Sequence, residues 1–227
     1  MKFIVFGLGN YGSSLGRKLV ELGHEVFGVD SSNERVEKMK NRITYTVSMD
    51  ATNREAIQGL PLKEADMVII AIGENEGTII LLSALLKQIG VKRIICRVTS
   101  PLQKAILESM GLTEFVYPEL DSAERNAYML DFREVLDSHR VCEKYQIAEV
   151  IVPGRYIGIK ISDIEFDHKY EIQLVSVKRS VEDRNIIGVM RKKNKTLGKV
   201  GSDFMLKAGD ILILFGESKK ISEFLLE

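Results

Sequence analysis

The sequence predicts an α/β protein in which a doubly wound parallel sheet is followed by a smaller α+β domain. Three observations lead to this fold class. Short apolar runs alternate with helical patterns through the first half, and a glycine-rich turn follows the first of these runs. After about residue 119 the β-type segments succeed one another without that alternation. The 227 residues are enough for one large domain or two modest ones, each with a buried core.

In the first half, six short β-type runs are expected to be strands, at 2–6, 25–30, 44–47, 66–72, 93–98 and 114–117. Apolar residues at helical spacing predict helices between them, at 13–22, 33–40, 54–59, 75–89 and 101–110. The run Met67–Ile72 has no polar alternation, which is typical of a strand covered by helices on both faces. Alternating strands and helices imply right-handed crossovers and a parallel sheet.

The first domain is expected to cover residues 1–118. Residues 119–140 predict one longer connector helix, because Pro118 would stop a strand and Asp121 can cap a helix. Residues 141–227 predict the α+β domain. Its strands are expected at 147–152, 172–178, 186–191 and 211–215, and a final helix at 218–226.

The composition excludes several classes of protein. Lys plus Arg equals Asp plus Glu, at 32 each, so no charge excess favours nucleic acid as a partner. The basic run Arg191–Lys195 is interpreted as a solvated turn. Two cysteines suggest neither a disulfide framework nor a metal cluster, which favours a reducing cytoplasm. No segment approaches the roughly 20 apolar residues that cross a bilayer, so work at a membrane would need a partner.

The glycine-rich turn is Gly7-Leu8-Gly9-Asn10-Tyr11-Gly12. Gly7 follows the first strand directly, where the chain must turn sharply. Gly9 leaves room for a pyrophosphate at the backbone, and Gly12 lets the next helix pack closely and present its N-terminus to phosphate. The context therefore predicts a Rossmann-type, nucleotide-binding domain.

The second strand ends in Asp30, 18 residues beyond Gly12 and next to Ser31. A carboxylate there can accept hydrogen bonds from ribose hydroxyls and would repel a 2′-phosphate, which favours an unphosphorylated adenosine ribose. The alternative is that Asp30 merely caps the next helix.

Three further loops should reach the same crevice, since they follow the carboxyl ends of parallel strands. Met49-Asp50-Ala51-Thr52 would lie beside the adenine pocket, although a helix cap at Asp50 or Thr52 is as consistent with the spacing. Ala71-Ile72-Gly73-Glu74-Asn75 should pass near the ribose and phosphates. Arg97 ends the fifth strand and could pair with phosphate, or alternatively form an inter-subunit or surface ion pair.

No catalytic set accompanies this domain. The three histidines, His24, His139 and His168, have no evident partner in the sequence. Tyr156 and Lys160 match the Y-x-x-x-K pair of short-chain dehydrogenases, but that pair must share one face of a helix, and the nearby Gly158 argues against one. The sequence therefore argues against an enzyme.

The carboxylates of Glu119, Asp121 and Glu124 could bind a hard cation. Carboxylates at a helix start more often act as caps and dipole partners. Three from one chain would leave a cation under-coordinated unless a second subunit contributes.

Several motifs together resemble the RCK/KTN family, the cytoplasmic regulatory subunits of Trk- and Ktr-type potassium transporters. They are the segment Phe3–Gly12, Gly23-His24-Glu25-Val26 leading to Asp30, Asp50-Ala51-Thr52 and Tyr117-Pro118-Glu119. The second half is similar to the family's C-terminal domain, with a glycine-containing stretch at 158–164 and Leu206-Lys207-Ala208-Gly209-Asp210 before the last strand.

The resemblance implies a non-enzymatic role, with ATP, ADP or NAD(H) bound in the Rossmann crevice. It implies a homodimer that builds an octameric ring beneath a membrane-embedded potassium channel or transporter subunit. The protein would thus be cytoplasmic and peripheral to the inner face of the membrane. Glu119 matches a glutamate that, in some members, binds a divalent or sodium cation at the dimer interface.

Two positions depart from the family pattern. Where Ktr-type members commonly carry an arginine that reaches the terminal phosphate in a neighbouring subunit, this chain has Asn10. Where some members bind cyclic di-AMP through an arginine, it has Asp167, so no cyclic dinucleotide site is expected. A small NAD-dependent oxidoreductase, and a nucleotide sensor of another cation transporter, are the alternatives.

Overall fold

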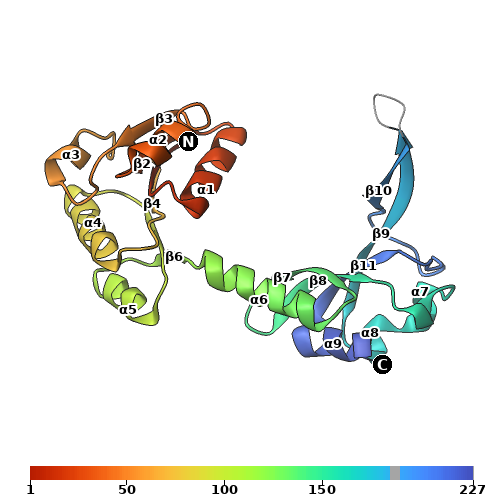
Figure 1. The fold of residues 1–227 in the computed structure, drawn as a ribbon. Helices are drawn as coiled ribbons and strands as arrows, with labels where there is room; N and C mark the ends of the chain where they lie inside the picture. The colour runs from red at the N-terminus through yellow and green to blue at the C-terminus, as the bar shows by residue number, and fades with distance from the viewer. Residues whose placement is uncertain (185–189, 227) are drawn as a thin grey trace. The chain divides into compact units, whose positions relative to one another are not determined.

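A computed structural model describes residues 1–184 and 190–226, and the chain divides into two units, Met1–Leu120 and Asp121–Glu227 (Figure 1). Both the doubly wound α/β fold and the following smaller α+β fold are confirmed. Among the described residues, no helix is long and apolar enough to cross a membrane.

The first unit is built on a six-stranded, fully parallel sheet with the order β3-β2-β1-β4-β5-β6. The strands β2 and β3 follow β1 on one side of it. The chain then crosses back, and β4, β5 and β6 follow on the other side of β1. The switch point between β1 and β4 is where doubly wound sheets bind their ligands. The strands are β1 (Lys2–Phe6), β2 (Glu25–Asp30), β3 (Tyr45–Ser48), β4 (Met67–Ile70), β5 (Ile94–Arg97) and β6 (Glu114–Val116).

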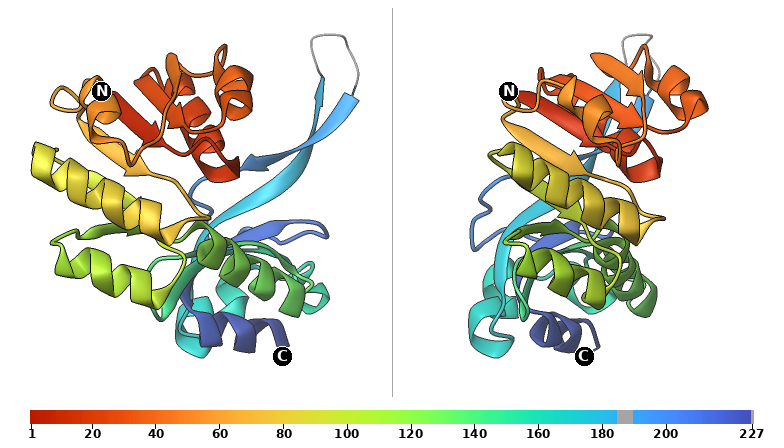
Figure 2. Two further views of the ribbon diagram at one scale, coloured as in Figure 1. Left: turned by 60° about the vertical axis from the view of Figure 1, so that its left-hand side comes forward. Right: turned by 90° about the vertical axis from the view of Figure 1, so that its left-hand side faces the viewer.

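Helices cover both faces of this sheet, as Figure 2 shows. Alternate side chains of β1 enter two different cores: Phe3 and Val5 pack on the side of α1 and α2, and Ile4 and Phe6 on the opposite side. Serine or asparagine side chains cap α2, α3, α4 and α5 by accepting backbone N–H groups. The helices are α1 (Asn10–Glu21), α2 (Asn33–Met39), α3 (Arg54–Gln58), α4 (Glu76–Ile89) and α5 (Pro101–Ser109).

The second unit has a five-stranded antiparallel sheet with the order β10-β9-β11-β8-β7. Its core joins this sheet to residues of α6 and α9, and the Tyr128 hydroxyl lies 3.3 Å from the Ser222 hydroxyl between these helices. The elements are α6 (Pro118–Asp131), β7 (Val135–Arg140), β8 (Tyr145–Ile151), a 3-10 turn (Gly154–Tyr156), α7 (Ile161–Ile164), α8 (Phe166–Lys169), β9 (Gln173–Arg184), β10 (Met190–Thr196), β11 (Ile211–Glu217) and α9 (Ser218–Leu226).

The predicted connector helix at 119–140 is wrong in its second half. The helix α6 ends at Asp131, and β7 begins at Val135. Val135 is 4% exposed and packs in the second core, while β7 pairs antiparallel with β8. Tertiary pairing outweighs the local helical pattern here, because burial against a sheet contributes more than helix propensity.

Two predictions concern the β9–β10 hairpin. The basic run Arg191–Lys195 is not a turn, because it lies within β10 and pairs with β9. Lys193 and Lys195 are nonetheless exposed, as a solvated segment requires. Of the strand predicted at 186–191, residues 186–189 lie outside the described residues, and the last two belong to β10.

Candidate functional site

A cleft of about 390 Å³ opens at the carboxyl ends of the first unit's strands, at the switch point. It brings together almost every residue that the sequence singled out; Gly12 and Thr52 do not line it. The sequence analysis did not single out Val29, Arg35 or Thr78, which also line the cleft. The full lining is Gly7, Gly9, Asn10, Tyr11, Val29, Asp30, Ser31, Arg35, Met49, Asp50, Ala51, Ala71, Ile72, Gly73, Glu74, Asn75, Thr78, Arg97 and Glu119.

Each of the three loop glycines is required for a different structural reason. Gly7 has a φ of +94°, and its N–H donates to the Val29 carbonyl at 2.7 Å, which closes the turn from β1. A Cβ atom at Gly12 would lie 1.8 Å from the Gly7 carbonyl oxygen, so Gly12 serves helix packing. A Cβ atom at Gly9 would meet nothing within 4 Å. Of these three glycines, only Gly9 is not required by the packing of the chain itself, and it lines the cleft.

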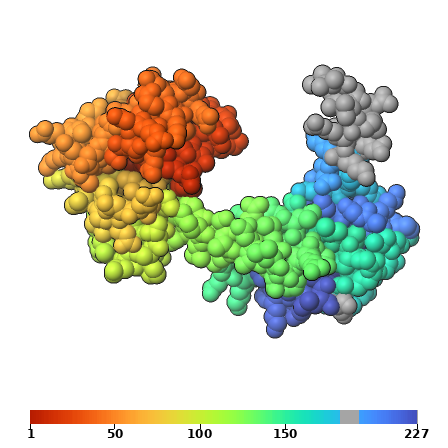
Figure 3. Space-filling model, in the orientation of Figure 1, coloured from red at the N-terminus to blue at the C-terminus, as the bar shows by residue number. Residues whose placement is uncertain are grey.

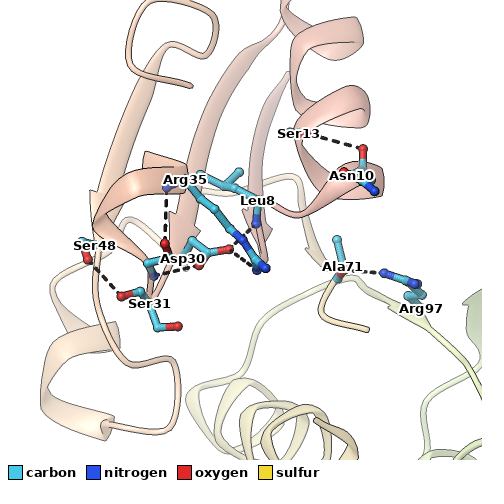
Figure 4. A network of polar contacts seen from close by, with 10 residues as sticks. Leu8, Asn10, Ser13, Asp30, Ser31, Arg35, Ser48, Ala71 and Arg97 are labelled. Carbon is cyan, nitrogen blue, oxygen red and sulfur yellow. Dashed lines mark hydrogen bonds and ion pairs between the residues drawn. The ribbon is translucent and has the colours of Figure 1, made fainter. Parts of the chain in front are cut away.

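The helix α1 begins at Asn10, with Gly9 as N-cap and no side chain capping its end. Such a helix end offers N–H donors and a positive dipole to an anion. Asn10 is exposed. Its backbone carbonyl accepts a hydrogen bond from the Ser13 hydroxyl at 3.3 Å (Figure 4).

Asp30 is held at the end of β2 by backbone donors (Figure 4). Its carboxylate accepts the N–H groups of Leu8 at 2.7 Å and Ser32 at 2.8 Å, and the residue is only 7% exposed. It does not cap α2, since the Ser32 side chain is the cap. The Asp30 carboxylate instead joins the glycine loop to the start of α2, and it lines the cleft.

Arg35, from the first turns of α2, lies with Nη1 3.7 Å from Oδ2 of Asp30. The sequence analysis missed this residue, although a basic side chain one turn into the helix after an acidic strand end was the available signal. The guanidinium partly offsets the Asp30 charge, and the Arg35 side chain is half exposed.

Asp50 and Thr52 form a local turn rather than a helix cap. The Asp50 carboxylate accepts the backbone N–H of Thr52 at 2.8 Å and its hydroxyl at 2.7 Å, and these bonds lower the pKa of Asp50. The cap of α3 is Asn53. Asp50 is thereby kept ionised and lines the cleft, whereas Thr52 hydrogen-bonds to its carboxylate without lining the cleft.

Arg97 forms an ion pair with Glu119 inside the cleft. Its Nε also donates to Glu119 at 3.4 Å. Figure 4 shows its other contact, in which Nη1 donates to the Ala71 carbonyl at 3.3 Å. Arg97 therefore lies in the predicted crevice, and its ion pair joins two residues of one chain, so it is not the inter-subunit pair of the alternative. Its pairing with a phosphate stays a prediction.

Glu119 is not joined by a set of cation ligands. Over residues 1–184 and 190–226, no three His, Cys, Asp or Glu side chains group together as a metal site would require. Glu124 pairs instead with Arg140. A cation at Glu119 stays a prediction that would need further ligands.

Acidic side chains outnumber basic ones in the cleft. Asp30, Asp50, Glu74 and Glu119 face the two guanidinium groups of Arg35 and Arg97, a formal charge of −2. A strongly anionic ligand must therefore bring a cation or rearrange these ion pairs.

The residues that could have formed a dehydrogenase pair do not share a site. The Tyr156 hydroxyl is buried and hydrogen-bonded to the Tyr170 hydroxyl at 2.5 Å, while the Lys160 ammonium pairs with Asp203 at 3.2 Å. Tyr156 ends a 3-10 turn and Lys160 precedes α7, so they are not on one helix.

Comparisons with known proteins agree with this architecture. The TrkA-N domain family matches residues 3–118. The Ktr system potassium uptake protein C of Bacillus subtilis is 30% identical over 223 residues, covering 98% of this chain and 95% of that protein.

Two solved structures are also similar. The GsuK channel bound to NAD superposes with a TM-score of 0.64 at 17% identity, covering 100% of this chain and 39% of that one, which shows a shared fold. The NAD(P)-binding domain of an exopolyphosphatase-related protein from Archaeoglobus fulgidus has a TM-score of 0.50 at 27% identity, covering 57% of this chain and 95% of that one.

Proposed function

The chain belongs to the TrkA-N family, and we propose that it is the nucleotide-binding regulatory subunit of a membrane potassium-uptake system. The observation that carries the proposal is the cleft at the switch point between β1 and β4, which combines an open glycine, a helix N-terminus and a buried ribose-type carboxylate. The similarity to a Ktr potassium uptake protein extends over nearly the whole chain.

In the proposed complex, Asp30 accepts hydrogen bonds from the adenosine ribose, and the phosphates lie over Gly9 and the start of α1. Asp50 and Ala51 border the adenine, while Ile72, Gly73 and Glu74 border the ribose and phosphates. Arg97 faces the far end of the ligand. A relative described as NAD(P)-binding supports a dinucleotide, and the same cleft admits ATP or ADP.

A cation is part of this proposal for the more highly charged nucleotides. The cleft carries a formal charge of −2, so a divalent or sodium cation near Glu119 would offset the repulsion of a triphosphate.

The proposed subunit acts without catalysis. A bound nucleotide can shift the subunit between two conformations only through its difference in affinity for them. The transport protein would respond to that shift, and this chain would lie at the inner face of the membrane through its partner.

We propose self-association through α4, whose residues are yellow in Figure 3. Isoleucine, leucine and alanine make up most of this helix. Leu81 on α4 is 56% exposed and Leu102 on α5 is 69% exposed, on two helices that contact each other. A helix that is apolar on most sides is normally buried, which supports self-association through this surface. The homodimer and the octameric ring are proposed from the family resemblance alone.

The test is co-purification of the tagged chain with candidate potassium transport subunits, combined with thermal-shift titration by ATP, ADP and NADH. Nucleotide-dependent stabilisation and capture of a potassium transporter are expected. Capture of a cation/proton antiporter instead would change the partner, and a chain that no nucleotide stabilises would contradict the proposal.

A further inference from the structure

The Arg97 guanidinium is fixed on the floor of the cleft. Arg97 is the last residue of β5, and its side chain is only 17% exposed. A Cβ atom at Gly73 would lie 2.4 Å from Nη1 and 2.5 Å from Cζ, so the group lies directly against the backbone after β4. The hydrogen bond to the Ala71 carbonyl adds a backbone anchor.

Glu119 is the more exposed member of the pair. Its side chain is 60% exposed, and its carboxylate can be fully hydrated when it leaves Arg97. Arg97 would lose a buried position if it moved, whereas Glu119 would lose little. A competing anion is therefore expected to displace Glu119 and not Arg97.

A ligand phosphate is such a competitor. Arg97 and Glu119 both line the cleft that we propose to hold the nucleotide. Guanidinium pairs with phosphate through the same parallel N–H groups that it uses for carboxylate. A phosphate and a carboxylate on one guanidinium also repel each other at short range.

Glu119 is the second residue of α6, which begins at Pro118. The ion pair to Arg97 thus ties the first turn of α6 to β5. No residue of α6 is buried, so the helix start has little apolar packing to hold it when the pair breaks.

We propose that Arg97 reads the phosphate charge of the bound nucleotide by exchanging Glu119 for a ligand phosphate, which releases the first turn of α6. The inference rests on the nucleotide-binding function proposed above. It assigns the sensing of phosphate number to the Arg97–Glu119 pair, where the neutral Asn10 offers no charge for that purpose.

The test measures affinities of the full-length chain for adenosine, AMP and ADP by calorimetry in EDTA, which removes divalent cations. Glu119→Gln is expected to bind ADP at least about fivefold more tightly, a modest coupling, and to bind adenosine unchanged. Arg97→Gln should weaken ADP binding but not adenosine binding. In the double variant, the gain from Glu119→Gln should disappear.

The matched control is Glu114→Gln. Glu114 in β6 pairs with Arg93, the residue before β5, so the pair has the same residue types. Neither residue lines the cleft. Glu114→Gln should change no ligand affinity. Weaker ADP binding by Glu119→Gln, or a gain that persists without Arg97, would overturn the exchange.

Hydrogen–deuterium exchange provides a second readout. ADP should speed exchange at residues 122–125 of α6, and adenosine should not; equal exchange with both ligands would overturn the release of α6. If the wild type binds none of the three ligands, the nucleotide-binding function itself is contradicted. If the wild type binds ADP and Glu119→Gln binds it with the same affinity, only the exchange at Arg97 is contradicted.

Discussion

Gly12 packs against Gly7 so closely that a Cβ atom at residue 12 would lie 1.8 Å from the Gly7 carbonyl oxygen. Gly9, between them, has open space where its Cβ would be. Two glycines of one loop are thus required for different reasons, one by the folded chain and one by the ligand that we propose.

Gly12→Ala and Gly9→Ala should separate these reasons. Gly12→Ala is expected to lower the free energy of unfolding by about 2 kcal/mol, as overpacking does. Gly9→Ala should cost at most about 1 kcal/mol, because alanine is the poorer N-cap, yet weaken nucleotide binding by about tenfold or more. Chemical denaturation and calorimetry measure both quantities. Equal losses of stability would contradict this division.

Asp30→Ala should affect binding and stability together. The buried N–H of Leu8 would lose its acceptor, at a cost of about 1–3 kcal/mol. The ribose would lose its carboxylate, and ADP affinity should fall by about tenfold or more. Glu34→Gln, on the exposed face of α2, is the control and should change neither quantity. An Asp30→Ala protein with unchanged ADP affinity would remove the ribose assignment.

The charge of the cleft predicts a cation requirement that depends on the ligand. ATP carries more negative charge than NAD⁺, so Mg²⁺ should strengthen ATP binding by about fivefold or more and leave NAD⁺ binding almost unchanged. Titrations with Mg²⁺ and with EDTA at constant ionic strength measure this. Equal Mg²⁺ dependence for both ligands would argue against the role of the cleft's net charge.

Asp210 predicts how the second unit responds to acid. Burial raises the pKa of Asp210, but hydrogen bonds from the Arg179 guanidinium and the Lys207 N–H outweigh it and leave the pKa below its usual value. Stability from this pair is therefore complete above the unfolded pKa of 3.8 and is lost as the pH falls through the lower folded value.

Asp210→Asn should remove that part of the acid dependence and lower stability at neutral pH by about 3 kcal/mol or more, because Arg179 would lose a buried partner. Urea unfolding between pH 2 and pH 7, monitored by circular dichroism, compares the two proteins. Parallel pH profiles would contradict the role of Asp210.

Leu81→Asp should reduce the size of the assembly. An aspartate on the exposed face of α4 would be desolvated in an interface, whereas an isolated subunit would tolerate it. Light scattering after gel filtration gives the mass of the particle. Leu22→Asp, a change at a leucine that is 62% exposed after α1, is the control. An unchanged particle mass with Leu81→Asp would place the interface elsewhere.

The succession of strands and helices along the first unit was predictable because each carries its own local pattern. The second unit was harder. The residues of β7 read locally as the continuation of a helix, and only their pairing with β8 makes them a strand. The basic residues of β10 carry no apolar alternation, so their strand structure depends on the register with β9.

The cleft could be located because parallel strands deliver their following loops to one edge of the sheet. Its glycines and Asp30 belong to one local motif. The contacts of Arg35 and Glu119 could not be predicted from the sequence. The contact of Arg35 with Asp30 depends on the direction of a helical side chain, and the contact of Glu119 with Arg97 joins residues 22 positions apart.

The close approach of the Arg97 guanidinium to Gly73 has an evolutionary consequence. Any side chain at position 73 would occupy the space of that guanidinium. Homologues that lose the glycine should lose the arginine as well, and homologues that keep the arginine should keep the glycine. Positions 73 and 97 are therefore expected to covary among homologues.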